Sequence, residues 1–574
     1  MKNIEKLGEV ISTDVLVIGG GISGMCAAMK AKESQVDVKV IDKGAVGWAG
    51  HVPIAGGAII DVPPGQEDEW FNFAVRNGGY LNNQDWTYAF AENIHRNLTE
   101  LFSWGFPFVT IKGEIAILSR LKDYATTQFA PAKSMIKLKS AAKARGVGIL
   151  DKIFMVDLLQ QDGKVVGAIG FSLLDGKTYI FHSKAVIIAS SSCRYQRAKL
   201  FAAISGEGPA MAYRAGAQLM NDEFHNNYGY ELKATGTFHR HAMYLFFENA
   251  LGERIIEKYY PEVAASKERG KEIQDFWQIA DAMYREVQAG RGPIYLDLTK
   301  LTPEEREIAT TKRFVELDYG ALPPPIYCMR AFQVLREKAG IDPDKDKIEV
   351  QPMFTVGQGP LRIDLNCKTT LDGLWAVGDA ASLGSGWTGA RASGTHPGWS
   401  IAFAIVSGFR GGQSAGEHAA TADKVEIDYE RAKQIKKRIF APLGRQGDMR
   451  ANDIIYQVHE AIVPMKYNFY REAGRLKEAI GIVDKARQSL VRVGAKDAHE
   501  LMRYHQAESM VLSAEWDLRS ALMREESRGT HYREDFPYRD DKNWLKWLVI
   551  KEEKGLPRLW TENVPIEKYR LKPK

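Results

Sequence analysis

The sequence predicts an α/β protein with a doubly wound, Rossmann-type parallel sheet and a helical region near its C-terminal end. Two observations predict the sheet. A β-branched run at 15–18 leads into a glycine-rich turn and a helix, and the apolar runs 185–190 and 374–381 have the composition of buried parallel strands. A third observation predicts the helical region, because apolar residues recur at i, i+3 and i+4 spacing over 454–491 and 498–523.

The first sixty residues contain the complete βαβ fingerprint of a dinucleotide site. An apolar strand leads into Gly-Gly-Gly-Ile-Ser-Gly at 19–24, a helix rich in small residues follows, and a second strand ends at Asp42. Gly19 permits the tight turn, Gly21 lets the backbone approach a pyrophosphate, and Gly24 lets the helix pack closely on the strand. The helix start offers N–H groups to the phosphates, and Asp42 is placed to bind a ribose hydroxyl.

A second stretch with the same glycine spacing, at 384–389, is not expected to bind a dinucleotide. It does not follow a strand directly, and Phe409 rather than an acidic residue stands about 20 residues later. The sequence therefore predicts one dinucleotide site and no separate site for NAD(P)H.

Composition and charge exclude several other classes of protein. Hydrophobic residues make up 45% and charged residues 26% of the chain, which is typical of a globular protein and excludes a disordered or collagen-like one. A net charge of +5 over 574 residues is too small to indicate nucleic-acid binding. No apolar run reaches the roughly 18 residues of a membrane span, and the charged N-terminal residues do not resemble a signal peptide, so we expect a cytoplasmic protein. The cysteines stand singly, which favours buried thiols and no metal site or iron–sulfur cluster in this chain: Cys26, Cys193, Cys328 and Cys367.

Several motifs together resemble one superfamily of flavoproteins. The glycine motif at 19–24 and Leu-Trp-Ala-Val-Gly-Asp-Ala-Ala at 374–381 are similar to the FAD-binding domain of the fumarate reductase and succinate dehydrogenase flavoprotein superfamily. The segments 205–217, 290–297 and 497–537 resemble its helix before the substrate loop, the end of its capping domain and its helical domain. Within the superfamily the chain resembles in particular the α-subunit of dissimilatory adenylylsulfate reductase, and the resemblance covers nearly the whole chain.

The resemblance implies an FAD-binding domain in two parts, with an α+β capping domain inserted between them. We expect the FAD-binding domain over residues 1–220 and 345–415, and the capping domain over 221–344. A helical domain is expected over 425–540 and a C-terminal tail over 541–574.

The resemblance also implies FAD as the cofactor. The family's late aspartate contacts the ribitol region, which corresponds to Asp379, and a helix start after Thr395 or His396 points at the flavin pyrimidine ring, where its dipole favours the anionic reduced flavin. His51 lies where fumarate reductases carry a histidine bonded to FAD. Adenylylsulfate reductases lack that bond, and we expect non-covalent FAD. The residues expected at the cofactor are Gly19, Gly21, Ile22, Ser23, Gly24, Asp42, Lys43, Gly50, His51, Gly56, Gly57, Ala189, Ser190, Gly378, Asp379, Thr395, Ser400 and Ile401.

The expected substrate loop, 221–228, departs from both kinds of relative. His225 falls where adenylylsulfate reductases carry an arginine, and Tyr228 falls where fumarate reductases carry a substrate-binding histidine. Met353 or Phe354 likewise stands where either family places a histidine. A dicarboxylate needs cationic partners, so these departures indicate a changed substrate pocket. Proton donors and a substrate cation are expected among His225, Tyr228, Arg391 and His396, although a core histidine and a structural ion pair are the alternatives for His225 and Arg391.

The resemblance implies a multi-subunit enzyme, since both relatives pass electrons to a separate iron–sulfur subunit. We expect an FAD-dependent oxidoreductase subunit of an anaerobic electron-transfer complex. It would exchange electrons between a small-molecule substrate and a ferredoxin-like iron–sulfur partner, and it would reach a membrane only through such partners. Two alternatives stay open: a fumarate reductase-like reductase of an activated C=C bond, and an electron-relay flavoprotein without an organic substrate.

Overall fold

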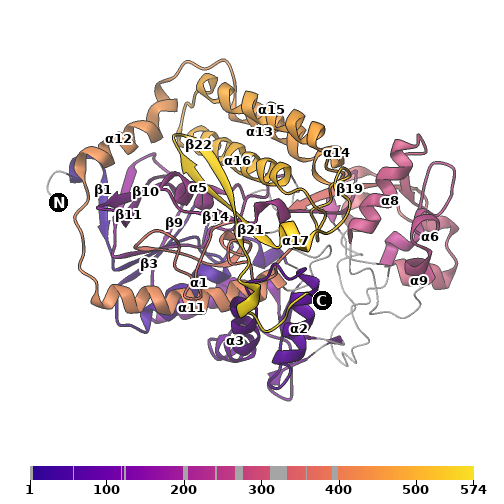
Figure 1. The fold of residues 1–574 in the computed structure, drawn as a ribbon, viewed down its shortest axis with the longest axis horizontal. Coiled ribbons are helices and arrows are strands. Elements are labelled where there is room, and N and C mark those ends of the chain that lie inside the picture. The colour runs from indigo at the N-terminus through magenta and orange to yellow at the C-terminus, as the bar shows by residue number, and fades with distance from the viewer. Residues whose placement is uncertain are drawn as a thin grey trace.

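The computed structural model places the predicted parallel sheet at one end of an elongated molecule (Figure 1). Helices of the C-terminal third lie along one side of the molecule, and the capping elements lie at the end of the long axis opposite the sheet. The structure describes residues 4–48, 50–55, 57–117, 119–121, 124–197, 204–238, 242–265, 276–310, 332–356, 358–390 and 399–573.

A five-stranded parallel sheet with the order β20-β13-β2-β3-β9 forms the centre of the N-terminal domain. Every residue of β2 and β13 is buried, because helices and a second sheet cover the two faces. The α/β class predicted from the apolar runs is therefore confirmed. The strands are β2 (Val15–Ile18), β3 (Val38–Asp42), β9 (Gly148–Asp151), β13 (Ala185–Ile188) and β20 (Leu374–Ala376).

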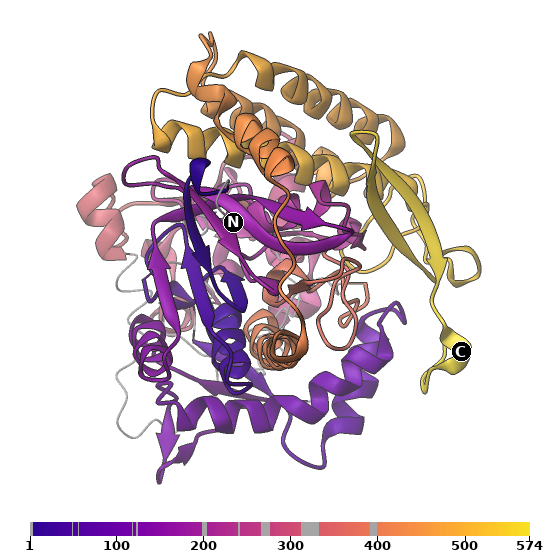
Figure 2. The ribbon, with the colours of Figure 1, turned by 90° about the vertical axis from the view of Figure 1, so that its left-hand side faces the viewer.

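Two helices pack against each other along one face of this sheet, and both views show them side by side (Figures 1 and 2). They are α1 (Ile22–Lys32) and α11 (Trp399–Thr421). Glycines four residues apart on α11 allow the contact. A Cβ on Gly412 would lie 2.2 Å from the Ala27 carbonyl oxygen, and one on Gly416 would lie 2.7 Å from that of Ala31. Side chains at these positions would force the helices apart.

Smaller sheets and further helices also belong to the N-terminal domain. An antiparallel layer with β1 added in parallel has the order β1-β12-β11-β10, and a short sheet has the order β4-β8-β7. The elements are β1 (Glu9–Ser12), β4 (Ala58–Asp61), β7 (Ser119–Leu121), β8 (Tyr124–Gln128), β10 (Ile153–Gln161), β11 (Lys164–Ser172), β12 (Thr178–His182), α2 (Glu67–Asn77), α3 (Gln84–Ser103) and α4 (Pro131–Ala144).

The capping domain contains an antiparallel sheet with the order β16-β15-β19-β18-β17. Its long pair joins β15 (Asn226–Leu232) to β19 (Ile348–Val356), with Tyr228 opposite Phe354. The strand β19, which leads back to the N-terminal domain, therefore belongs to the same sheet as β15. The remaining elements are β16 (Thr237–Phe238), β17 (Phe247–Glu248), β18 (Ile294–Leu296), α6 (Ile255–Tyr259), α7 (Pro261–Ala265), α8 (Phe276–Gln288) and α9 (Pro303–Thr310).

The C-terminal third forms the predicted helical domain. Its core is apolar and includes Ile454, Leu476 and Met510, which are fully buried. Among the described residues, no helix combines the length and the apolar character needed to cross a membrane. The main helices are α12 (Tyr429–Phe440), α13 (Ala451–Ile462), α15 (Ala473–Ser489) and α16 (Ala498–Met523).

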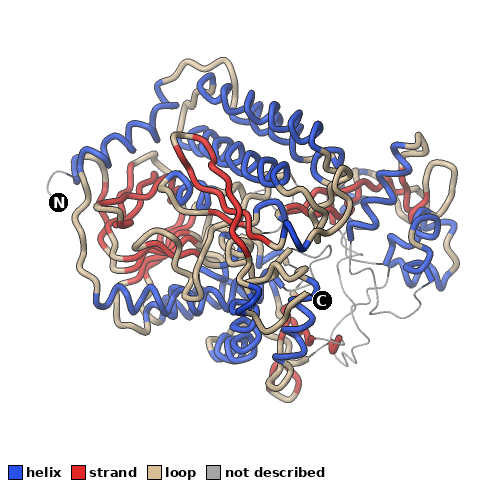
Figure 3. The backbone as a smooth tube through the Cα atoms, in the orientation of Figure 1, coloured by secondary structure: helices blue, strands red, loops and turns tan. Residues whose placement is uncertain are grey.

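A β-hairpin occupies the region where the sequence analysis places a tail. It consists of β21 (Lys546–Glu553) and β22 (Leu556–Asn563). Strand β21 pairs with β14 (Leu219–Met220), which directly precedes the substrate loop in the chain. In Figure 3 the hairpin lies across the face turned toward the viewer, and Figure 2 shows it at the outside of the molecule. The following residues return to α3, where the Gln84 side chain donates to the Leu571 carbonyl at 2.6 Å.

Two glycine-to-alanine changes should separate close packing from helix propensity. We expect Gly412→Ala to lower the free energy of unfolding by about 1–3 kcal/mol, because its methyl group would overlap the backbone of α1. Gly481→Ala is the matched control on α15, where a Cβ meets no described atom within 4 Å, and it should raise stability by about 0.5–1 kcal/mol. Urea denaturation of both variants measures the difference, and equal effects would contradict the packing described.

Candidate functional site

The carboxyl ends of the central strands converge where the strand order reverses, between β2 and β13. Gly19 follows β2 with a φ of +114°, and a Cβ there would lie 2.4 Å from the Ala189 carbonyl oxygen at the end of β13. Gly378 follows β20 with a φ of +66°, and its Cβ would lie 2.5 Å from the Ser23 Oγ at the start of α1. Ligands of doubly wound sheets bind in the crevice at this point.

The glycine turn has the geometry that the sequence predicts. A Cβ on Gly24 would lie 1.9 Å from the Gly19 carbonyl oxygen, so α1 begins directly against the turn. Gly21, the N-cap of α1, differs from Gly19 and Gly24, because a Cβ on Gly21 would meet no described atom within 4 Å. The N-terminus of α1 therefore borders open space, as a pyrophosphate site requires.

Asp42 and Lys43 hold the turn in place. The two Asp42 carboxylate oxygens accept hydrogen bonds from the backbone N–H groups of Gly20 (2.8 Å) and Gly44 (2.6 Å). The Lys43 ammonium lies 2.5 Å from Oε1 of Glu207. Burial alone would raise the pKa of Glu207, but Lys43 and the hydrogen bonds to the carboxylate together lower it. Lys43 thus joins the end of β3 to α5 (Glu207–Arg214).

A buried ion pair flanks the strand ends, and the sequence analysis anticipates only one of its members. Nη2 of Arg194 donates to Oδ2 of Asp379 at 2.8 Å, and the two side chains are 6% and 13% exposed. The other Asp379 oxygen, Oδ1, is buried without a hydrogen-bond partner in the described part of the chain, as are Ser190 Oγ and Gln358 Oε1. Buried polar atoms normally have partners, so these three fit a polar ligand held at the strand ends. The available signal for Arg194 was its place just after the strand 185–190.

The start of α11 and the loop around His51 border the same region. The Gln358 side chain donates to Ser400 Oγ at 3.2 Å, and Ile401 packs on the core of the N-terminal domain. A Cβ on Gly50 would lie 4.0 Å from the Gly21 Cα, which places the His51 loop beside the glycine turn. Four predicted site residues lie outside the described residues: Gly56, Arg391, Thr395 and His396.

The two candidate residues of the substrate loop are buried and bonded to backbone. Nδ1 of His225 lies 2.5 Å from the Gln358 carbonyl oxygen, and Nε2 lies 2.9 Å from that of Cys193. The Tyr228 hydroxyl donates to the Val463 carbonyl at 3.2 Å, and its ring contacts Phe354. Contact of His225 and Tyr228 with a substrate stays a prediction.

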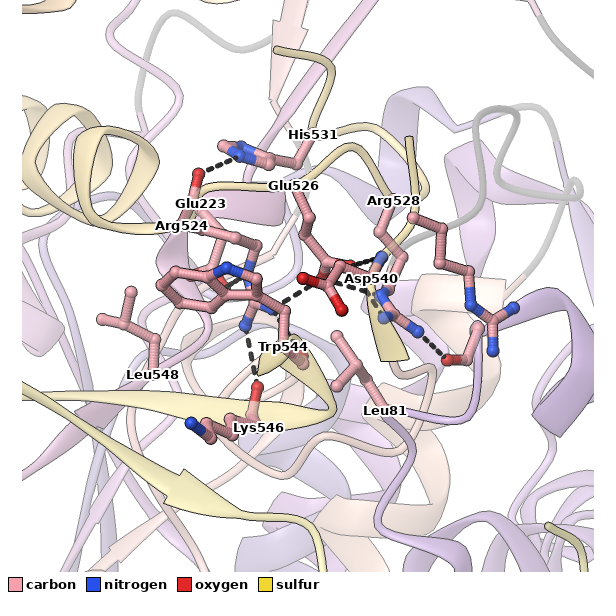
Figure 4. A network of polar contacts seen from close by, with 12 residues as sticks. Leu81, Glu223, Arg524, Glu526, Arg528, His531, Asp540, Trp544, Lys546 and Leu548 are labelled. Atoms are coloured by element: carbon pink, nitrogen blue, oxygen red, sulfur yellow. Dashed lines mark hydrogen bonds and ion pairs between the residues drawn. The ribbon is translucent and has the colours of Figure 1, made fainter. Parts of the chain in front are cut away.

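Buried charges join the substrate loop to the C-terminal segment, as Figure 4 shows. Glu223, in the short helix η4 (Asp222–Phe224), accepts a hydrogen bond from Nε of Arg524 at 2.7 Å. Arg524 also binds Glu526 at 2.9 Å, and Glu526 binds Arg528 at 2.7 Å. These side chains are at most 2% exposed. The network fixes the position of the loop from the side of the C-terminal segment. No local sequence pattern indicated the pairing of Glu223 with Arg524.

Comparison with known proteins identifies the family. Residues 14–396 match the FAD binding domain family, and residues 460–574 match the C-terminal domain of fumarate reductase flavoproteins. One subunit of the fumarate reductase (CoM/CoB) of Methanothermobacter marburgensis is 27% identical, and the alignment covers 95% of this chain and 98% of that protein. The structure of E. coli quinol fumarate reductase superposes with a TM-score of 0.80 at 23% identity, covering 99% of this chain and 98% of the other. That of adenylylsulfate reductase from Archaeoglobus fulgidus gives 0.73 at 20% identity over the same shares.

Fold and site thus define an FAD-dependent oxidoreductase. The chain belongs to the fumarate reductase and succinate dehydrogenase flavoprotein family, and its cofactor is FAD. The predicted family and cofactor are confirmed. The likeness to adenylylsulfate reductase is one of fold, whereas the relatives found by sequence include several fumarate reductases. FAD supplies hydride and single-electron transfer, and the strand ends described above would hold it.

Substitution of two glycines in the same turn should separate cofactor binding from folding. Gly21→Ala should change the stability of the apoprotein by less than about 1 kcal/mol but weaken FAD binding by about tenfold or more, because its methyl group enters the space expected for the pyrophosphate. Gly24→Ala should destabilise the apoprotein itself by about 1–3 kcal/mol. FAD titration followed by fluorescence, together with thermal unfolding of the apoprotein, distinguishes the two effects.

Loss of the Glu223 charge should be far more costly than loss of a surface charge. Glu223→Gln leaves Arg524 less well compensated in a fully buried site, and we expect a loss of about 3–5 kcal/mol of stability. Glu567→Gln changes an 86% exposed partner of Lys572 and should leave the stability nearly unchanged. If the two variants unfold at the same denaturant concentration, the network does not support the loop.

Proposed function

We propose that this chain is the flavoprotein subunit of an electron-transfer complex, exchanging electrons between a small substrate and a separate iron–sulfur partner. The observation that supports the proposal is an FAD-binding domain whose described residues include no second redox group. The cysteines described there, Cys26, Cys193 and Cys367, are separate, buried thiols. Burial raises the pKa of Cys193 to about 12, so it is not poised as a thiolate ligand.

The substrate we propose is a molecule with an activated C=C bond and fewer negative charges than a dicarboxylate. Fumarate reductases among the relatives favour the C=C chemistry. Tyr228, and Met353 or Phe354, stand where the relatives are expected to carry histidines, and this favours a substrate with fewer negative charges. In the cap sheet Tyr228 lies opposite Phe354 and Gly229 lies opposite Met353. These side chains offer no positive charge to a carboxylate.

Each described part of the site has a place in this proposal. Arg194 and Asp379 would orient the cofactor at the strand ends, and the α11 N-terminus would favour negative charge on the reduced flavin ring. The capping domain would close over the substrate and exclude water. His51 would shape the loop beside a non-covalently bound cofactor.

Reoxidation of the reduced protein tests the substrate. The protein, purified without oxygen from its native host and reduced with dithionite, is mixed with a panel of enoates, and the flavin absorbance is followed. We expect monocarboxylate enoates to reoxidise it faster than fumarate. Bleaching of the oxidised flavin by sulfite would favour adenylylsulfate reductase-like chemistry instead. Reoxidation by protein partners alone would indicate an electron relay.

The same preparation tests the partner and the cofactor linkage. Mass spectrometry of co-eluting proteins should identify an iron–sulfur protein, and a flavoprotein that elutes alone would contradict the complex. Acid precipitation should leave the flavin in the supernatant. Flavin in the pellet, released by His51→Ala, would instead show a covalent bond to that residue.

A further inference from the structure

His225 lies between two backbone carbonyl groups and has a ring nitrogen directed at each. The distances are 2.5 Å from Nδ1 to the Gln358 oxygen and 2.9 Å from Nε2 to the Cys193 oxygen, and the residue is 2% exposed. A neutral imidazole has one N–H group and one lone pair. It would satisfy one carbonyl and direct its lone pair at the oxygen of the other. An imidazolium donates to both.

A carboxylate is available to balance that charge. Oδ1 of Asp222 lies 3.8 Å from Nδ1 of His225, is buried, and has no hydrogen-bond partner in the described residues. Burial, together with the carboxylates of Asp517 and Glu223, raises the pKa of Asp222 well above its usual range. Asp222 and His225 therefore compete for one proton. If the proton is on Asp222, the neutral His225 can donate to only one of the two carbonyls. If the proton is on His225, each carbonyl has a donor, and Asp222 and His225 form an ion pair.

The two carbonyls belong to segments that both contact Asp379, the residue expected to bind the cofactor. Arg194, next to Cys193, donates to the Asp379 carboxylate at 2.8 Å. Gly359, next to Gln358, donates its N–H to the Asp379 carbonyl. Hydrogen bonds from His225 to both segments thus hold them together on either side of Asp379.

We propose that His225 is a positioning residue of the FAD site: a protonated imidazole, with Asp222 as its counter-charge, that fixes the segments on both sides of Asp379. This role rests on FAD binding and not on the substrate or partner proposed above. The positive charge also favours the anionic form of the reduced flavin.

The thiol and phenol groups near this pair keep one charge state through neutral pH. Burial raises the pKa values of the Cys193 thiol and of the Tyr195 and Tyr228 hydroxyls, which stay neutral. Further charges come from the elements packed around the loop: Glu223 on η4, Asp517 on α16, Arg471 before α15, Arg524 after α16, and the Arg194–Asp379 pair. A change in FAD binding between pH 6 and 9 that requires both His225 and Asp222 therefore reports on the protonation of this pair.

Nitrogen NMR of the holoprotein labelled with ¹⁵N-histidine reads the proton directly. At pH 8.5 ordinary histidines show one unprotonated ring nitrogen. We expect one histidine with two protonated nitrogens, absent in His225→Asn and His225→Gln and changed in Asp222→Asn. Absence of such a signal from the wild-type protein, which needs no variant, overturns the proposal. So does a signal that persists in a folded His225 variant.

Flavin binding and redox equilibrium test the positioning role. His225→Asn should weaken FAD binding about tenfold, because one buried carbonyl loses its donor. At a fixed dye potential it should also lower the ratio of reduced to oxidised flavin about tenfold. The matched control is His505→Asn, a buried histidine of the helical domain that bonds to the Ile439 carbonyl, and it should leave both values unchanged. Equal effects of the two variants would assign His225 a structural role only. Failure to reduce enoates would leave these results intact and bear only on the proposed substrate.

Discussion

Close approach of backbone to backbone at the strand ends is the constraint on which the flavin site depends. Gly19 lies against the end of β13, and α1 begins so near the turn that Gly24 can carry no side chain. The same closeness continues along α1, where α11 contacts it through glycines. Because both helices start at this edge of the sheet, their N-termini and the strand ends surround one region. A cofactor with two phosphates and an electron-accepting ring suits that arrangement.

The loop 221–228, where the sequence predicts substrate contacts, is held by charge rather than by close packing. Loop residues between β14 and β15 carry three polar side chains into the interior. Glu223 pairs with Arg524, His225 lies between two backbone carbonyl groups, and Asp222 lies 3.8 Å from the His225 ring. Buried ion pairs add little net stability compared with apolar packing, but they allow one arrangement and penalise others. The loop between β14 and β15 is therefore fixed in position at the cost of several desolvated charges. A rigid support of this kind is what a site needs when the reacting groups must stay aligned.

Local patterns in the sequence predicted the parts of the structure that depend on neighbours along the chain. The apolar run before 19–24, the glycine spacing and Asp42 define a strand, a turn and a second strand without reference to distant residues. Arg194 was missed because its partner, Asp379, lies 185 residues away. The hairpin 546–563 was missed because its strand character depends on pairing with β14, more than 300 residues earlier in the chain.

A position on the predicted substrate loop does not by itself fix the chemical role of His225. Its place on the substrate loop suggested a proton donor to substrate, yet the direction of its ring depends on two carbonyls from other segments and on Asp222 three residues earlier. A ring held on both nitrogens is poorly suited to give up a proton, because release would break one of two buried hydrogen bonds. The same contacts suit a fixed charge, which affects the cofactor without taking part in the reaction. If His225 is the fixed charge that we propose, proton delivery to the substrate falls to other groups.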